Sequence, residues 1–168
     1  VFAAPGASTE GWQEVKLPGE VVAPGLPRTG IIWLRKEVEI PPDGGPLRLI
    51  LPIDGYYSVY FDGKLVNETT FESFPGRGSN LSAELPPGEA SDGRHVIAIR
   101  IYQPDRPARF TRTLSLRNLA QTVNLDGPWQ AKAEHTFPAI SPEVLAAAPV
   151  PPEQAPPPHK LFCALFNG

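Results

Sequence analysis

Cysteine and methionine are almost missing from this chain. Cys163 is the only cysteine among 168 residues, so no intrachain disulfide can form, and one cysteine is compatible with either an oxidising or a reducing compartment. Methionine is absent, from which we expect a chain that begins after processing or that is part of a larger protein. No apolar run approaches the roughly 20 residues that a membrane-spanning helix needs, so we expect no membrane interaction.

A basic surface is also missing. The chain has 15 Lys and Arg against 18 Asp and Glu, a formal net charge of -3 at pH 7. Proteins that bind nucleic acid need clustered cations to neutralise phosphates, so we expect no nucleic-acid partner. Proline is abundant instead, with 22 residues beside 15 glycines. Both residue types weaken helices and favour turns, which predicts one all-β domain.

The most regular strand signal lies at residues 30–40. Apolar residues alternate there with Trp33, Arg35 and two glutamates, which predicts a half-buried strand with these side chains on the outer face. The strongest hairpin signal is Asp62-Gly63 between two β-rich runs. This dipeptide supplies the positive φ angles of a two-residue type I′ turn.

Further short strands follow from alternating segments that proline and glycine turns separate. About eight or nine strands at this spacing predict a jelly-roll β-sandwich over residues 11–137, after a flexible N-terminus at residues 1–10. The only helical candidate is 143–148. The additional strands are predicted at residues 11–19, 47–51, 69–74, 82–85, 95–102, 110–116, 121–125 and 129–134.

Composition changes after Phe137. Eight of the 21 residues from 138 to 158 are prolines, which favours extended polyproline conformation. We interpret residues 138–168 as a proline-rich strap or linker that ends in an apolar segment from Leu161 to Phe166. Such a segment needs a partner surface, either this domain's own sheet or a catalytic domain.

Several motifs follow one another in a recognisable order. Trp12 precedes a Leu-Pro-Gly turn, Trp33-Leu34-Arg35 lies in a strand, Asp62-Gly63 forms the hairpin and a strand follows from His95. This order resembles the sugar-binding jelly-roll domains of glycoside hydrolase family 2. The string Leu125-Asp126-Gly127-Pro128-Trp129, the proline-rich stretch and Leu165-Phe166-Asn167-Gly168 make it more similar to the domain inserted in bacterial sialate O-acetylesterases.

The resemblance implies a galactose-binding-like fold and a non-catalytic, carbohydrate-binding-like accessory domain of a secreted hydrolase, extracellular or periplasmic. The esterase's own catalytic blocks, Gly-Asp-Ser and a late Asp-x-x-His, are missing from this sequence. Asp62-Gly63 also stands where Asn-Gly is usual. The alternative is a free-standing carbohydrate- or protein-interaction module with no enzyme attached.

The sequence shows no catalytic or metal-binding constellation of its own. The string Gly76-Arg77-Gly78-Ser79-Asn80 does not fit a Gly-x-Ser-x-Gly nucleophile elbow, and the three histidines are scattered. No His or Cys spacing is typical of a metal site. We therefore expect no catalytic residue and no cofactor, although jelly rolls of this kind often carry a structural calcium. Paired carboxylates for glycoside hydrolysis stay open as an alternative, because they would come from different strands.

Sugar binding requires an aromatic face for the apolar side of a pyranose and planar polar groups for its hydroxyls. Trp33, Arg35, Tyr56, Tyr57 and Arg77 are the candidates for these roles. In the competing interpretation, Trp33 is a packing residue and Arg35 pairs with a nearby glutamate.

Overall fold

The computed structural model describes residues 2–40, 47–69, 81–85, 93–119 and 121–138. The chain divides into one unit of residues 1–137 and another of residues 138–168, and all the described strands belong to the first. The predicted strand at 69–74, the helical candidate at 143–148 and the segment from Leu161 to Phe166 lie outside the described residues, except for Thr69.

All described elements are β-strands, and none is a helix. They are β1 (Gln13–Leu17), β2 (Gly19–Glu20), β3 (Gly30–Glu39), β4 (Arg48–Leu51), β5 (Ile53–Asp54), β6 (Tyr56–Phe61), β7 (Lys64–Glu68), β8 (Leu81–Glu84), β9 (Arg94–Gln103), β10 (Arg109–Phe110), β11 (Ser115–Arg117), β12 (Thr122–Asn124) and β13 (Gly127–Thr136).

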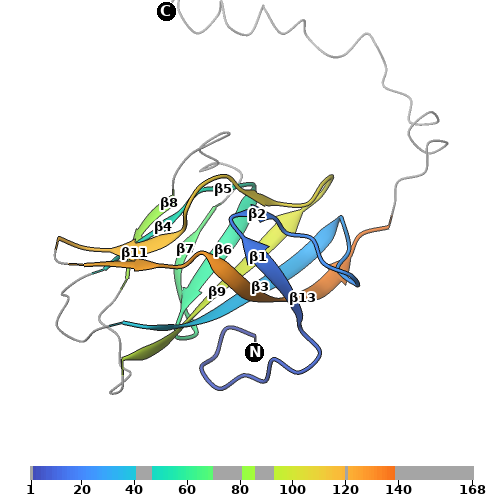
Figure 1. Cartoon of the computed structure of the whole chain (residues 1–168). Helices are drawn as coiled ribbons and strands as arrows, with labels where there is room; N and C mark the ends of the chain where they lie inside the picture. The colour runs from blue at the N-terminus through green and yellow to red at the C-terminus, as the bar shows by residue number, and fades with distance from the viewer. Residues whose placement is uncertain (1, 41–46, 70–80, 86–92, 120, 139–168) are drawn as a thin grey trace, which may run out of the picture. The chain divides into compact units, whose positions relative to one another are not determined.

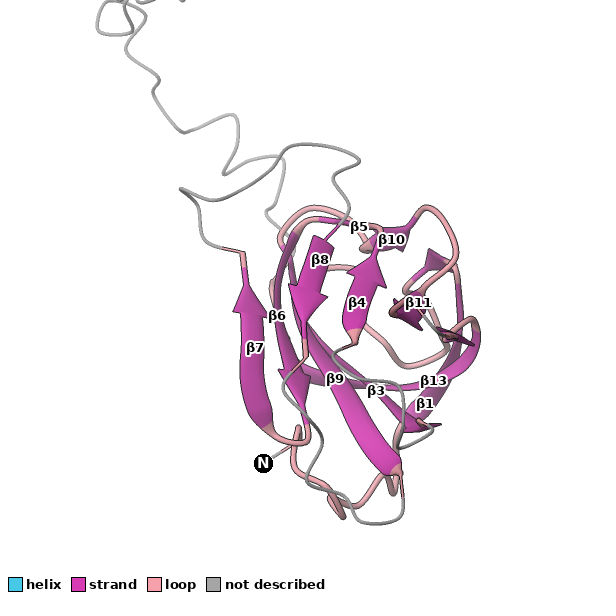
Figure 2. Cartoon of the chain, turned by 90° about the vertical axis from the view of Figure 1, so that its left-hand side faces the viewer, coloured by secondary structure: helices cyan, strands magenta, loops and turns pink. Residues whose placement is uncertain are grey.

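Antiparallel pairing joins these strands into three sheets. The largest has six strands in the order β1-β13-β3-β9-β6-β7, a second has the order β12-β11-β4-β8, and a small third has the order β2-β10-β5. The four-stranded sheet lies across one face of the six-stranded sheet (Figures 1 and 2). This arrangement confirms the predicted all-β jelly-roll sandwich.

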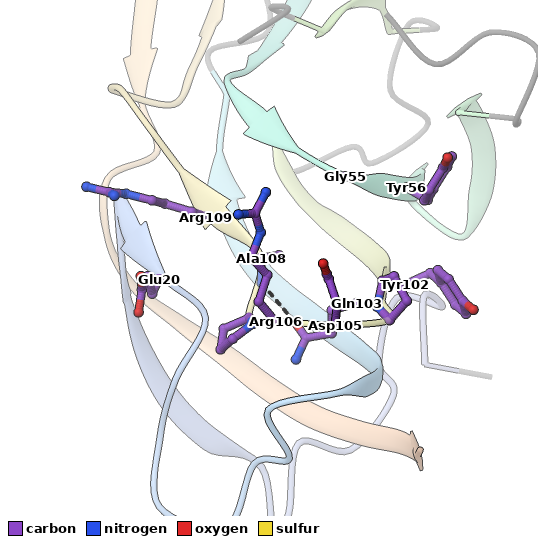
Figure 3. A pocket seen from close by; sticks show the side chains of 11 residues that line it. Glu20, Gly55, Tyr56, Tyr102, Gln103, Asp105, Arg106, Ala108 and Arg109 are labelled. Atoms are coloured by element: carbon purple, nitrogen blue, oxygen red, sulfur yellow. Dashed lines mark hydrogen bonds between the residues drawn. The ribbon is translucent and has the colours of Figure 1, made fainter. Parts of the chain in front are cut away.

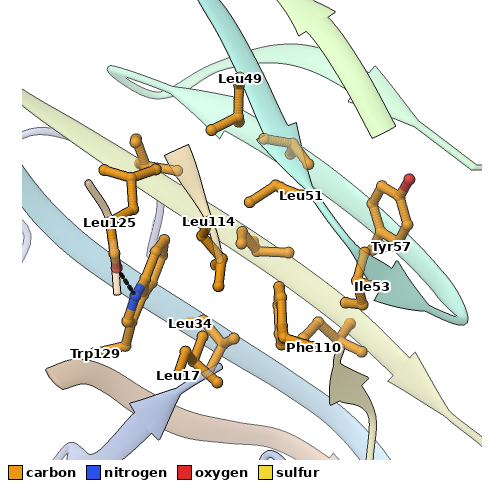
Figure 4. Close-up of a cluster of buried hydrophobic side chains, with 14 of the residues drawn as sticks. Leu17, Leu34, Leu49, Leu51, Ile53, Tyr57, Phe110, Leu114, Leu125 and Trp129 are labelled. Carbon is orange, nitrogen blue, oxygen red and sulfur yellow. Dashed lines mark hydrogen bonds between the residues drawn. The ribbon is translucent and has the colours of Figure 1, made fainter. Parts of the chain in front are cut away.

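The core fills the space between the two larger sheets (Figure 4). Leu34 of β3, Ile99 of β9 and Leu49 of β4 each have 0% exposure, and complete burial of such side chains contributes roughly 1.5–3 kcal/mol each. Trp129 is also buried, and its indole Nε1 donates to Leu125 O at 2.9 Å. The alternating apolar positions of the sequence therefore mark the core face correctly.

The Asp62-Gly63 turn connects β6 to β7 as predicted. Asp62 has a φ of 48° and Gly63 a φ of 81°, the two positive angles that a type I′ turn requires. Asp62 N donates to Val96 O at 2.9 Å, so the turn is also attached to β9. The alternate β6 residues Tyr57 and Val59 point into the core.

The predicted strand at 110–116 is divided between two sheets. Phe110 of β10 pairs with Ile53 in the small sheet, whereas Leu116 of β11 pairs with Leu49 in the four-stranded sheet. The alternation of apolar side chains continues through the crossing, with Phe110, Leu114 and Leu116 all buried. Period-two patterning reports burial and not the identity of the partner strand, so one strand was expected.

The outer face of β3 is more buried than a half-buried strand requires. Trp33 is 7% exposed and Arg35 is 1% exposed, because the start of the chain lies over them. The Phe2 ring packs edge-on against Trp33 at a centroid distance of 5.8 Å, and Ala3 is buried in the same cluster. Residues 1–10, predicted to be flexible, thus include side chains that cover this face of the sheet.

Candidate functional site

An open pocket of about 470 Å³ lies beside the loop that follows β9. It combines two tyrosines, two arginines and two carboxylates with small and proline residues. In the view of Figure 3, Tyr56 and Tyr102 lie on one side, and Glu20 and Arg109 lie on the other. The lining residues are Glu20, Gly55, Tyr56, Tyr102, Gln103, Pro104, Asp105, Arg106, Pro107, Ala108 and Arg109.

Gln103 holds in place the 104–108 loop that lines this pocket. Its side chain is 2% exposed, and its Nε2 donates to Pro27 O at 3.1 Å and to Arg28 O at 3.2 Å. Its Oε1 accepts from Ala108 N at 3.1 Å. One buried amide with its hydrogen-bonding groups satisfied therefore ties the 104–108 loop to the 21–29 loop, and a satisfied buried polar group rigidifies its surroundings.

The charged groups of the pocket are open to solvent. Glu20, Asp105, Arg106 and Arg109 are exposed, and within the described part of the chain none of them has an ion-pair partner. Guanidinium groups donate in a plane, and carboxylates accept. The pocket can therefore donate hydrogen bonds to neighbouring hydroxyl groups and accept hydrogen bonds from them.

The two tyrosines form the aromatic side of the pocket. Tyr56 and Tyr102 are opposite each other in the pairing of β6 with β9, with ring centroids 6.3 Å apart and planes inclined at 67°. Tyr102 is 43% exposed. An exposed aromatic ring beside planar donors and acceptors can contact both the apolar face and the polar edge of a small ligand.

Trp33 and Arg35, two of the predicted site residues, are occupied by contacts within the chain. Trp33 Nε1 donates to Glu134 Oε2 at 2.6 Å. Arg35 Nη1 donates to Ala4 O at 2.9 Å, and its Nη2 lies 3.4 Å from Glu37 Oε1. These are the contacts of the packing interpretation, and a ligand-binding role for either residue stays a prediction.

The other predicted residues have different positions. Tyr56 lines the pocket. Tyr57 is 4% exposed in the core, and burial raises its pKa to about 12, so its phenol is not presented to a ligand. Arg77 lies outside the described residues. The structure therefore brings Tyr56 to the pocket and separates it from Trp33, Arg35 and Tyr57.

Sequence reasoning missed Tyr102, Arg106 and Arg109 as site residues. In the predicted strand at 95–102 the alternation of side chains puts Tyr102 on the face opposite the isoleucines, and the sequence predicts a loop at 103–109, but neither pattern by itself indicates a binding site. The available signal was a loop with charged residues between prolines directly after an outward-facing tyrosine. Such loops on a rigid scaffold commonly carry binding residues.

A second polar arrangement lies on the outer face of the six-stranded sheet. Arg100 Nε and Nη2 donate to Glu134 Oε2 and Oε1 at 2.7 and 2.8 Å, and about one third of each side chain is exposed (34% and 33%). The hydrogen bonds from Arg100 hold the pKa of Glu134 below its ordinary value, and the same contact raises the pKa of Arg100. Arg100 is two residues from Tyr102 along β9, on the same face.

Among the described residues, no three His, Cys, Asp or Glu side chains form a group that could hold a metal ion. In that same part of the chain, no helix is long and apolar enough to cross a membrane.

Comparison with known proteins supports the fold. No protein-family model matches the chain, and no curated protein sequence matches it. Among solved structures, the chain is similar to Streptomyces avermitilis α-L-rhamnosidase complexed with L-rhamnose, with a TM-score of 0.50 and 18% sequence identity. The match covers 76% of this chain but 12% of the rhamnosidase. The finer resemblance, to sialate O-acetylesterases, rests on sequence motifs alone.

Proposed function

We propose that this chain is a non-catalytic carbohydrate-binding module and that the pocket beside residues 104–108 is its binding site. The observation that carries the proposal is the composition of the pocket, which combines the exposed Tyr102 and the half-buried Tyr56 with arginines and carboxylates that have no ion-pair partner among the described residues. Carbohydrates present apolar C–H faces and polar hydroxyl edges, and this pocket offers both kinds of partner.

Each group has a distinct part in the proposed binding. Tyr102 packs against the C–H face of a sugar ring, with Tyr56 at its edge. Arg106 and Arg109 donate to hydroxyl or carboxylate oxygens, and Asp105 accepts from hydroxyl groups. A hexose has about 12 heavy atoms, and at roughly 0.3 kcal/mol per atom the binding free energy is about 3.6 kcal/mol, which gives an expected Kd of about 2 mM.

The pocket can be tested by titrating the chain with monosaccharides up to about 20 mM, since millimolar affinity is expected, and following amide shifts by NMR. The panel includes L-rhamnose, galactose and N-acetylneuraminic acid. Tyr102→Ala and Arg109→Ala should abolish measurable binding, whereas Arg117→Ala, an exposed arginine of the four-stranded sheet, should retain it. Equal binding by all three variants, or no binding by the natural chain, would refute this site.

We further propose that the module is the accessory domain of a secreted carbohydrate-active hydrolase of sialate O-acetylesterase type, extracellular or periplasmic. The order of the sequence motifs supports this proposal. A similar fold also occurs within a rhamnosidase that was solved with a sugar.

The alternative is a free-standing carbohydrate- or protein-interaction module. The sequence of the complete gene product distinguishes the two. A Gly-Asp-Ser block and an Asp-x-x-His block in the flanking protein support the esterase, whereas a gene product without them contradicts it.

A further inference from the structure

A row of aromatic side chains continues from the pocket across one end of the six-stranded sheet, where β6 begins and β9 and β13 end. Tyr56, Tyr102, Phe137 and His135 make up this row, which we call the aromatic strip. The centroid distances are 6.3 Å from Tyr56 to Tyr102, 5.2 Å from Tyr102 to Phe137 and 5.5 Å from Phe137 to His135. Tyr102 belongs to both the pocket and the strip, so the two surfaces are continuous.

The strip lies on the side of the sheet that faces away from the core. Ile101 has 0% exposure, and side chains alternate along a strand, so Tyr102 points to the opposite face. His135 is exposed, and Tyr56 and Phe137 are half-buried. The strip is therefore an aromatic surface that a partner can reach without opening the core.

Backbone contacts hold the strip in place. Tyr102 is opposite Tyr56 on one side and Ile31 on the other in the sheet register. Phe137 N donates to Thr29 O at 3.2 Å, just after the end of β13. Because strands and hydrogen bonds fix the rings, a ligand would not have to order them on binding, and preorganisation of this kind favours affinity.

Planar polar groups flank the strip. The Arg100–Glu134 pair lies on the same face of the sheet, with about one third of each side chain exposed. Glu134 directly precedes His135, and Arg100 is the nearest outward-facing residue of β9 before Tyr102. Unlike the charged groups of the pocket, these two side chains bind each other, and they place a planar donor–acceptor pair beside the aromatic rings.

We propose that the aromatic strip extends the pocket into a binding surface for a soluble oligosaccharide chain of several sugar units. This inference rests on the carbohydrate-binding function proposed above and specifies its ligand as a chain, rather than a single terminal sugar. Each additional unit that reaches the strip brings further apolar surface into contact with a ring, so affinity should rise with chain length.

The orientation of the rings also indicates the form of the chain. Tyr102 is inclined at 67° to Tyr56 and at 60° to Phe137, so successive rings do not share a plane. A flat crystalline polysaccharide could lie on only one of these rings at a time. A chain that turns between units can contact them in succession.

The inference can be tested by calorimetric titration with linear soluble oligosaccharides of one to six units from xylan, mannan, β-glucan and galactan. For the best-bound series, Kd should fall about tenfold from one unit to four, which corresponds to about 1.4 kcal/mol. Phe137→Ala should remove this gain and keep the monosaccharide affinity within about twofold, about 0.4 kcal/mol. Leu119→Ala is the matched control, because Leu119 is fully exposed between β11 and β12.

The outcomes separate this inference from the pocket. An affinity that does not depend on chain length, or a gain that Phe137→Ala leaves intact, overturns the strip but not the pocket. Preferential binding to insoluble cellulose or chitin overturns the proposed soluble chain. No binding to any saccharide overturns both proposals. If Phe137→Ala does not fold, His135→Ala at the exposed end of the strip provides the same comparison.

Discussion

The Asp62 side chain should be a main source of stability for the hairpin, because it makes two contacts that a simple turn does not need. Its Oδ1 accepts from Val96 N at 2.8 Å, and its Oδ2 lies 2.7 Å from His95 Nδ1. A carboxylate can only accept, which assigns the proton to Nδ1. His95 is 7% exposed and stacks on Phe61 at a centroid distance of 5.0 Å.

Three substitutions separate the hydrogen bonds from the backbone conformation. Asp62→Gly tolerates the φ of 48° but leaves Val96 N and His95 without their acceptor, which should lower the free energy of unfolding by about 2–3 kcal/mol. Asp62→Ala adds strain in the left-handed region, for a further loss of about 0.5–1 kcal/mol. Asp62→Asn keeps an acceptor and a residue suited to this φ, and should lose about 1 kcal/mol.

Urea unfolding followed by tryptophan fluorescence measures the free energy of unfolding of the natural chain and the three variants. In thermal unfolding, the melting temperature of Asp62→Ala should fall by about 10 °C. The expected order of stability is natural chain, Asn, Gly, Ala. If Asp62→Asn is as unstable as Asp62→Gly, acceptance by the side chain is not what stabilises the turn. If Asp62→Ala loses less than about 1 kcal/mol, below the range for one buried donor without a partner, the reasoning is wrong.

Two further predictions concern pH. Burial raises the pKa of Tyr57 from 10.0 to about 12, so the unfolded chain loses the phenol proton first and the free energy of unfolding should fall between pH 10 and 12. The free energy of unfolding of Tyr57→Phe should fall less over this pH range. Urea midpoints that change equally in the natural chain and in Tyr57→Phe would contradict this prediction. The Arg100 hydrogen bonds lower the pKa of Glu134 from 4.5, so this contribution is present above pH 4.5 and is lost as pH falls through the folded pKa. Glu134→Gln should therefore show a weaker loss of stability below pH 4.5, and identical urea midpoint profiles would count against the pair.

The sandwich was predictable from the sequence because its signals are local. The Asp62-Gly63 dipeptide specifies the φ angles of its own turn, and the isoleucines of β9 alternate within one strand. By contrast, the same period-two alternation in β3 predicts that Trp33 and Arg35 face the solvent. Their burial depends on Phe2, Ala3 and Ala4, which are about 30 positions away in the sequence, and no periodicity within β3 reports those contacts.

The site was less predictable because residues far apart in the sequence form it. Tyr56 was recognised as a candidate, but its neighbour Tyr102 comes from β9 and is fixed by sheet register. The loop between Tyr102 and Arg109 is held by Gln103, whose amide donates to backbone carbonyls about 75 positions earlier in the sequence. A glutamine near the end of a strand carries no sequence signal for such a role.

The core and the proposed binding surface are nevertheless two faces of the same strand. Ile97, Ile99 and Ile101 of β9 are completely buried, while Arg100 and Tyr102 point to the other side. A shift of one residue in the register of β9 would move the isoleucines out of the core and Tyr102 into it, at roughly 1.5–3 kcal/mol for each buried side chain. Core packing therefore fixes the register, and the register fixes the position of Tyr102 beside Tyr56 and Phe137. Substitutions that loosen the core under β9 should therefore weaken the proposed carbohydrate binding in the calorimetric titration, even where they contact no ligand.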